Sequence, residues 1–189
     1  FLSLAPRERV IGVTGTKGKT TTTLLIAHLL GSRAIAVGTP GVSFFDYFFT
    51  AREPLWVVGE FSSFDLEYVT ESPSMALYTS LFSDHLNRYA SFTAYARAKA
   101  NLFRFQKKGD IAILASTPEI HRHIPALAST ILWVDTDNGV VDPNISWRIA
   151  RPSIALALRV AKEVGIPMHT SKARLRSFES PHGRLEIIR

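Results

Sequence analysis

The residues best suited to chemistry lie in a segment rich in glycine, lysine and threonine near the N-terminus. Glycines allow the backbone to turn so that successive N–H groups point at one anion, and the start of a following helix adds partial positive charge. A lysine here can reach the β- and γ-phosphates of a nucleotide, and a threonine hydroxyl can bind Mg²⁺. The segment predicts a nucleoside triphosphate site formed by Gly15, Thr16, Lys17, Gly18, Lys19, Thr20 and Thr21.

The surroundings of this segment favour phosphate binding over a plain tight turn. A β-branched run at 10–13 predicts a buried strand before it, and apolar residues at 24–30 have helical spacing after it. The spacing departs from the general phosphate-loop pattern, because Val13 occupies the place of the first glycine and the glycines fall at Gly12 and Gly15. A tight β–α turn that binds nothing is the alternative.

Two further strand ends carry candidate metal ligands. The apolar run 55–58 predicts a buried strand that leads to Glu60, and the run 75–78 predicts another that is followed by His85. A carboxylate at the end of a buried strand costs free energy unless it is paired or binds a metal ion. Ligands of open α/β sheets collect at the carboxyl ends of the strands. We expect Glu60 to hold Mg²⁺ together with Thr20, and His85 to belong to the same site. A solvated glutamate and a structural histidine are the alternatives.

The remaining elements indicate an α/β protein. Apolar runs at 34–37, 110–114 and 130–134 predict further strands, and helices are expected at 91–105 and 151–164. Alternation of short strands with helices favours right-handed crossovers and a doubly wound, mainly parallel sheet. All 189 residues are expected to form one domain.

Three other groupings have ordinary structural interpretations. The aromatic cluster at 44–49 is expected to pack in the core. The segment 135–139 looks like a calcium loop, but its glycine comes one place early and Ser146 stands where the closing glutamate belongs, which favours a turn. No acidic residue completes a metal site around His121 and His123, which indicates a solvated helix face.

The composition limits the compartment and the partners. A hydrophobic content of 46% with 20% charged residues is typical of a globular protein, and the absence of cysteine excludes disulfides and thiolate metal sites. No apolar run approaches the ~20 residues that span a bilayer and no leader opens the chain, so we expect a cytoplasmic protein without membrane contact. The net charge of +6 suits a protein that handles anions, but no aromatic-interleaved basic patch accompanies it, which disfavours nucleic acid as a partner.

Four segments follow one another along nearly the whole chain in a recognisable order. They are Val-Thr-Gly-Thr-Lys-Gly-Lys-Thr-Thr at 13–21, Gly-Glu-Phe-Ser-Ser-Phe-Asp-Leu-Glu at 59–67, the stretch from Ser-Asp-His to Ala-Lys at 83–99, and Gly-Arg-Leu-Glu at 183–186. Together they resemble the ATP-binding central domain of the Mur ligases, the family that builds the stem peptide of peptidoglycan. The second segment is most similar to the member that adds D-glutamate.

The resemblance implies a reaction. ATP would phosphorylate the carboxylate of a UDP-muramoyl substrate, and the amine of an incoming amino acid would attack the acyl phosphate. The expected version adds D-glutamate to UDP-N-acetylmuramoyl-L-alanine. Lys19 would neutralise the β- and γ-phosphates, and Arg184 would contact nucleotide phosphates.

The resemblance also implies metal ligands. Thr20 and Glu60 would hold a first Mg²⁺ and His85 a second one. Lys99 matches the lysine that the family carbamylates, which turns a cation into an anionic oxygen ligand. A surface lysine is the alternative for Lys99.

Departures from the family leave a second interpretation open. The family's N-terminal UDP-binding domain and C-terminal amino-acid-binding domain are expected to be absent, so that this chain would bind Mg-ATP but ligate poorly. The loop 38–41 lacks an asparagine of the D-glutamate-adding member, and Ile149 and Ala150 replace a His-Asn pair near the adenine. A non-catalytic or degenerate nucleotide-binding module is therefore the alternative.

Two other functions are disfavoured. A regulatory GTPase would carry an Asn-Lys-x-Asp motif, which does not occur in the sequence. A folate-glutamating enzyme shares the fold, but residues 62–64 point away from it.

Overall fold

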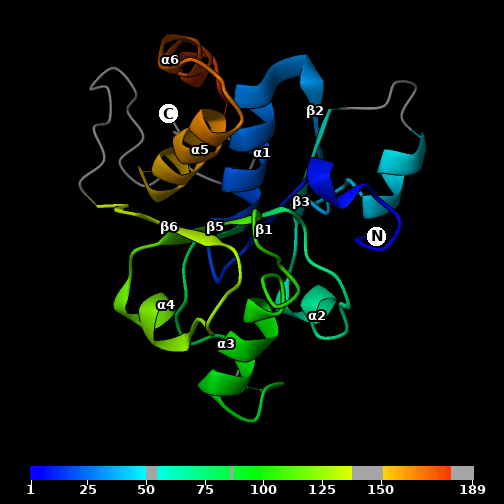
Figure 1. Ribbon diagram of the computed structural model, residues 1–189, viewed down its shortest axis with the longest axis vertical. Coiled ribbons are helices and arrows are strands. Elements are labelled where there is room, and N and C mark those ends of the chain that lie inside the picture. The colour runs from blue at the N-terminus through cyan, green and yellow to red at the C-terminus, as the bar shows by residue number, and fades with distance from the viewer. Residues whose placement is uncertain (50–54, 86, 138–150, 180–189) are drawn as a thin grey trace, which may run out of the picture.

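One parallel sheet separates two layers of helices (Figure 1). The computed structural model describes residues 1–49, 55–85, 87–137 and 151–179. The strands of the sheet lie in the order β2-β3-β1-β4-β5-β6, and every pairing is parallel. Their bounds are β1 Val10–Thr14, β2 Ala34–Val37, β3 Trp56–Glu60, β4 Met75–Tyr78, β5 Ile111–Ala115 and β6 Thr130–Val134.

The helices divide between the two faces of the sheet. Figure 1 shows α1, α5 and α6 on one side and α2, α3 and α4 on the other. The α-helices are α1 Lys19–Leu30, α2 Ser63–Leu66, α3 Phe92–Ala100, α4 Pro118–His123, α5 Arg151–Glu163 and α6 Met168–Arg176, and the 3-10 helices are η1 Arg7–Arg9, η2 Gly31–Arg33 and η3 Phe44–Phe49. None of the helices in the described ranges is long and apolar enough to cross a bilayer.

The central strands are buried on both faces, which explains their unbroken apolar sequences. In β1, Ile11 and Val13 join the core cluster that contains α1 and α5, whereas Val10 joins the cluster on the other side of the sheet. In β4, Leu77 and Tyr78 divide between the same two clusters. The predicted doubly wound, mainly parallel sheet is confirmed, and each predicted strand lies within two residues of an observed one.

The helix predicted at 91–105 is shorter than expected. Ser91 caps its start by accepting the N–H of Ala94, and α3 ends at Ala100. The N–H groups of residues 102–104 each bond three residues back, as in Leu102 N–H to Lys99 O, which is the pattern of turns. Asn101 donates its side-chain amide to Leu66 O at 3.0 Å, which ties this end of the helix to α2. Apolar residues past Ala100 therefore pack on the sheet from turns, which hydrophobic spacing alone does not distinguish from helix.

The prediction that the aromatic cluster packs in the core is wrong for three of its members. Tyr47 is buried, and Phe44 stacks on Phe61 with ring centroids 4.7 Å apart. Phe45, Phe48 and Phe49 are exposed. In the short helix η3 successive side chains point in different directions, so one face alone can reach the core.

A glycine at the end of β2 is expected to be more sensitive than its neighbour in the same loop. Gly38 and Gly41 both have positive φ values, of 71° and 83°. A Cβ atom at Gly38 would overlap the Phe44 ring and lie 2.5 Å from the backbone O of Glu60, whereas one at Gly41 would meet nothing within 4 Å. We expect Gly41→Ala to lower the free energy of unfolding by about 1 kcal/mol through backbone strain alone, and Gly38→Ala by about 3 kcal/mol because overpacking is added.

Urea unfolding of the two variants measures both costs. Equal losses of stability would contradict the close packing of β2 against the end of β3.

Candidate active site

The segment predicted to bind phosphate connects β1 to α1. Gly15 and Gly18 have φ values of 152° and 83°, and Gly18 is the N-terminal cap residue of α1. No side chain of the described residues caps this helix end. The first N–H groups of a helix have no acceptor within the helix, and they attract anions. Lys19 begins the helix and donates from Nζ to Thr16 O at 3.3 Å. The loop thus has the geometry of an anion site.

Glu60 lies beside this loop on the same side of the sheet as α1. It is the last residue of β3 and stands in register with Val13 of β1. Register partners of neighbouring parallel strands point to the same face, and Val13 packs in the cluster that contains α1. The Glu60 side chain is half-buried and its Oε2 atom is shielded from solvent. The strand-end position predicted for Glu60 is therefore observed.

Lys99 is buried among charges at the same edge of the sheet. It is 2% exposed, so it is not a surface lysine. Burial, together with the nearby Lys19 ammonium, lowers the pKa of Lys99 to about 7, and the carboxylates of Asp84, Asp65 and Glu60 oppose this shift. The structure thus gathers two amines and several carboxylates around the C-terminal ends of β1, β3 and β4.

His85 lies in the turn after β4 and is partly open to solvent. Its φ is 52°, which few non-glycine residues adopt. Its ring lies 5.3 Å from the Phe64 ring and 6.0 Å from the Tyr95 ring. Its backbone N–H donates to the Asp84 carboxylate at 2.9 Å. His85 thus lies at the same edge of the sheet as the loop that joins β1 to α1.

The turn that carries His85 is tied to the end of α2. Glu67 accepts a hydrogen bond from the Tyr89 hydroxyl at 2.8 Å and forms an ion pair with Arg88 at 3.1 Å. The bond from Tyr89 and then the bond from Arg88 lower the pKa of Glu67. The Arg88 guanidinium also lies over the Phe64 ring. This network restricts the turn in which His85 stands.

Tyr95 connects the separate parts of the site, although the sequence did not single it out as a site residue. Its hydroxyl donates to Thr16 Oγ1 at 3.3 Å, and the Lys99 ammonium lies 4.8 Å from its ring centroid. Its ring also neighbours that of His85. The spacing of four residues between Tyr95 and Lys99 places both on one face of α3, which was the available signal.

The donor types at this edge fit Mg²⁺, which prefers oxygen ligands and usually keeps several waters and substrate phosphates as well. Thr20 is buried in the first turn of α1 and Glu60 stands at the end of β3. Within the described ranges, no three His, Asp or Glu side chains are grouped closely enough to form a metal site by themselves. A Mg²⁺ ion here would therefore depend on the nucleotide for part of its coordination.

The other predicted site residues either make no contact with Glu60, His85 or Lys99 that is described above, or lie outside the described residues. Thr16 and Thr21 are buried, whereas the Lys17 ammonium points toward the Phe82 ring, 5.5 Å from its centroid. Arg184 lies outside the described residues.

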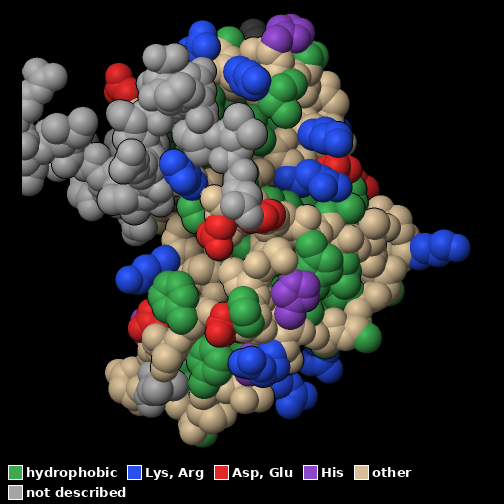
Figure 2. Space-filling view, turned by 90° about the vertical axis from the view of Figure 1, so that its left-hand side faces the viewer, with side chains coloured by type: hydrophobic (Ala, Val, Ile, Leu, Met, Phe, Trp, Pro, Cys, Tyr) green, Lys and Arg blue, Asp and Glu red, His purple; other side chains and the backbone are tan. Residues whose placement is uncertain are grey.

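Two of the three groupings given ordinary structural interpretations remain to be described, the one around His121 and the one at 135–139. The His121 ring stacks on Trp133 at 3.6 Å, and its Nε2 lies 3.1 Å from Ser116 Oγ. Asp135 accepts the N–H of Asp137 at 2.9 Å, as in a turn, and the rest of that segment lies outside the described residues. On the face seen in Figure 2, Lys and Arg side chains are spread over the surface, with a few close together at its lower end, and acidic and hydrophobic side chains lie between them.

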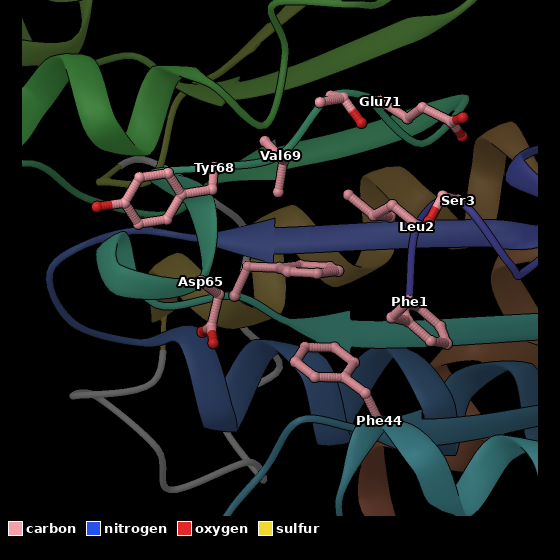
Figure 3. A pocket seen from close by; sticks show the side chains of 10 residues that line it. Phe1, Leu2, Ser3, Phe44, Asp65, Tyr68, Val69 and Glu71 are labelled. Carbon is pink, nitrogen blue, oxygen red and sulfur yellow. The ribbon is translucent and has the colours of Figure 1, made fainter.

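A separate cavity of about 290 Å³ opens between the N-terminal residues and α2. Figure 3 shows the Phe1 and Phe44 rings facing the same space, with Asp65, Tyr68 and Glu71 around it. Its lining contains no Lys, Arg or His. A cavity with this lining is unsuited to a triphosphate.

The buried amine of Lys99 should make stability depend on pH. Because its folded-state pKa of about 7 lies below the ordinary value of 10.5, the unfolded chain binds more protons between these pH values, and the free energy of unfolding rises with pH there. Relative to Lys99→Met, the unmodified chain is expected to gain up to about 1.4 kcal/mol per pH unit from pH 7 to pH 10.

Urea unfolding of both proteins across this range is the measurement, with the non-titrating variant Ser129→Ala as the baseline. A constant difference between the unmodified chain and Lys99→Met would show that the amine is not desolvated.

Comparison with known proteins places this geometry in a family. The family profile described as "Mur ligase middle domain" matches residues 13–139. Over 114 residues the chain is 41% identical to a UDP-N-acetylmuramoylalanine--D-glutamate ligase of Salinibacter ruber, covering 55% of this chain and 25% of that protein. It is 30% identical over 210 residues to the ligase of the same name from Solibacter usitatus, covering 97% and 47%. The chain thus spans half or less of the length of these relatives.

Solved structures support the fold. MurF from Acinetobacter baumannii superposes with a TM-score of 0.77 and 17% identity, over 97% of this chain and 48% of that one. A UDP-N-acetylmuramate:L-alanyl-gamma-D-glutamyl-meso-diaminopimelate ligase from Neisseria meningitides gives a TM-score of 0.69 with 16% identity, over 93% and 67%. At these identities the likeness concerns architecture alone. Because the family profile extends over more than half of the sequence, from the end of β1 past β6, the chain belongs to the Mur ligase family and contains its middle domain.

Proposed function

We propose that this chain is the ATP-binding core of an amide-forming ligase of peptidoglycan precursor synthesis. The observation that carries the proposal is the gathering of Lys19, Glu60 and Lys99 around the loop that joins β1 to α1. Phosphoryl transfer depends mostly on positioning and on neutralising charge, and this edge of the sheet offers amines, oxygen ligands and helix N–H groups together.

The proposed reaction has two steps. An oxygen of the substrate carboxylate attacks the γ-phosphorus of ATP, the bond from that phosphorus to ADP breaks, and an acyl phosphate forms. The amine of an amino acid then attacks the acyl carbon, inorganic phosphate leaves, and the amine loses a proton. Lys19 and the N–H groups of the loop would bind the β- and γ-phosphates, and Arg184 would add a further phosphate contact.

Two Mg²⁺ ions are proposed to complete the site. Thr20 and Glu60 would hold the first and His85 the second, while Tyr95 would keep Thr16 and His85 in place through the contacts described above. Bound Mg²⁺ supplies charge neutralisation on the phosphate oxygens.

Lys99 is proposed to act as a carbamate. The ammonium would first lose one proton; the neutral amine nitrogen would then bond to the carbon of CO₂ and lose a second proton, so that a cationic side chain becomes an anionic oxygen ligand. Its burial beside Lys19 supports this, because a buried ammonium next to another is disfavoured, whereas an anion there would be attracted to Lys19 and to Mg²⁺.

The proposed substrates are UDP-N-acetylmuramoyl-L-alanine and D-glutamate. Support comes from the names of the sequence relatives and from the segment at 59–67, which resembles the D-glutamate-adding member. Domains that bind the UDP group and the amino acid are proposed to complete the enzyme. Both nucleotide substrates favour a cytoplasmic location.

A second candidate is a non-catalytic nucleotide-binding module derived from the family. It is favoured by Thr39 and Pro40, which stand in the loop after β2 where the D-glutamate-adding member has asparagine and isoleucine. It is opposed by the burial of Lys99, which a binding module does not need.

One experiment separates the two candidates. The chain is incubated with Mg-ATP, UDP-N-acetylmuramoyl-L-alanine at high concentration and hydroxylamine, which traps an acyl phosphate as a hydroxamate, and Mg-ATP binding is measured in parallel by calorimetry. We expect hydroxamate and ADP to form together, and Lys99→Ala to reduce both by about 100-fold or more while it keeps Mg-ATP binding.

Lys107→Ala is the matched control, because this exposed lysine lies in the turn before β5, at the opposite edge of the sheet. Mg-ATP binding without any hydroxamate from the unmodified chain would favour the non-catalytic module. Absence of Mg-dependent ATP binding would overturn both candidates.

A further inference from the structure

Two hydroxyl residues that follow β4, Thr79 and Ser80, lie directly against the phosphate-binding loop. Thr79 is 5% exposed, and its backbone N–H donates to Thr14 O at 2.9 Å, which continues the pairing of β4 with β1 past the strand end. We call Thr79 and Ser80 the hydroxyl pair. Every contact below joins this pair to residues 14–17, which are more than 60 positions away in the sequence.

The pair holds the carbonyl group of Lys17 from two sides. Thr79 Oγ1 lies 2.6 Å from Lys17 O and 3.2 Å from Thr14 O. A hydroxyl has a single proton, so the shorter contact is the one to which Thr79 donates. Ser80 Oγ lies 3.0 Å from the same oxygen. A carbonyl oxygen has two lone pairs, and here both can accept.

Ser80 also holds the N–H groups of the loop. Its Oγ accepts the N–H of Lys17 at 2.9 Å, and its backbone O accepts the N–H of Thr16 at 2.8 Å. Both ends of residue Lys17 are therefore attached to the segment after β4. Without these hydrogen bonds, ordering the peptide groups of the loop would reduce the free energy of ligand binding.

The consequence concerns the peptide group between Lys17 and Gly18. In a planar trans peptide, the carbonyl and the following N–H point in opposite directions. Because the hydroxyl pair draws Lys17 O toward β4, the N–H of Gly18 must point away from β4. Gly18 is the cap residue of α1, so its N–H joins the unsatisfied donors at the start of that helix.

Gly15 provides a second and independent sign of this arrangement. A Cβ atom at Gly15 would overlap Thr79 Oγ1 and would lie 3.0 Å from Ser80 N. The glycine is thus required for the approach of the hydroxyl pair as well as for its own φ of 152°.

We propose that Thr79 and Ser80 are positioning residues that preset the loop for the β- and γ-phosphates of a nucleotide by fixing the orientation of the Lys17–Gly18 peptide. The proposal rests on the proposed function, since it assigns the preset donors to ATP. Neither residue touches the phosphates; both act through the backbone of Lys17.

The test uses three variants and one control. Thr79→Val removes the hydroxyl and keeps the shape, Thr79→Ser keeps the hydroxyl, and Ser80→Ala removes the acceptor of Lys17 N–H. The control, Ser129→Ala, removes a buried hydroxyl that donates to Gln106 Oε1 at 2.8 Å at the opposite end of the strands. Mg-ATP affinity is measured by calorimetry, and amide hydrogen exchange of Thr16, Lys17 and Gly18 is measured by NMR without nucleotide.

We expect Thr79→Val and Ser80→Ala to weaken Mg-ATP binding about tenfold and to speed exchange of the Lys17 amide about tenfold. Thr79→Ser should restore both to within about threefold of the unmodified chain, and Ser129→Ala should change neither. If the two residues only stabilised the fold, Thr79→Ser would not restore the affinity while the faster amide exchange stayed confined to the loop.

Affinity and exchange in Thr79→Val and Ser80→Ala that match those of Ser129→Ala would overturn the proposal. Should Thr79→Val not fold, Ser80→Ala and Thr79→Ser decide by the same two readouts. If the unmodified chain does not bind Mg-ATP, the proposed function and the assignment of the preset donors to phosphate both fail. Separately, unchanged exchange of the Lys17 amide in the variants would refute the claim that Thr79 and Ser80 fix the loop.

Discussion

The burial of the Lys99 amine among other charged side chains at the carboxyl edge of the sheet is the constraint on which the rest of this site depends. Lys99 is buried and lies near enough to Lys19 for the two ammonium groups to repel each other. Such a pair is tolerated only when one amine loses its proton or when anions stand close by. Glu60, Asp84 and Asp65 supply part of that negative charge. A triphosphate would supply much more, which is why this edge is suited to a nucleotide.

The fold creates this constraint because parallel strands end at one edge. β1 lies between β3 and β4, so the loop after β1 has Glu60 on one side and the hydroxyl pair on the other. Helix α3 lies on the opposite side of the sheet from α1 (Figure 1), and it carries Tyr95, which bonds to Thr16, and Lys99, which is near Lys19. The contributing residues come from several elements that are far apart in the sequence, and the strand order brings the ends of β1, β3 and β4 together.

Much of the fold could be predicted from the sequence, since strands buried on both faces have unbroken apolar runs. Glu60 was predictable because it is a lone charge at the end of such a run. Phe45, Phe48 and Phe49 were assigned wrongly, because aromatic composition gives no direction to a side chain in a short helix. The polar segment of α6 gave no periodic signal strong enough to predict a helix.

The candidate site was predictable only in part. Lys99 became a candidate through resemblance, since a lysine in an apolar helix shows nothing of its burial. Thr79 and Ser80 look like ordinary loop residues in the sequence, and their importance depends on the register between β1 and β4. That register joins positions far apart in the chain, which local patterns do not specify.

The central claim is that the ends of β1, β3 and β4 surround a single metal-bound triphosphate. Titration of the isotopically labelled chain with Mn²⁺-ATP in place of Mg²⁺-ATP tests it most directly, because the paramagnetic ion broadens amide resonances of residues close to it. The account predicts that signals of residues 15–20, Glu60 and His85 broaden together at the same stoichiometry. Broadening of the loop signals while those of Glu60 and His85 keep their intensity would contradict it.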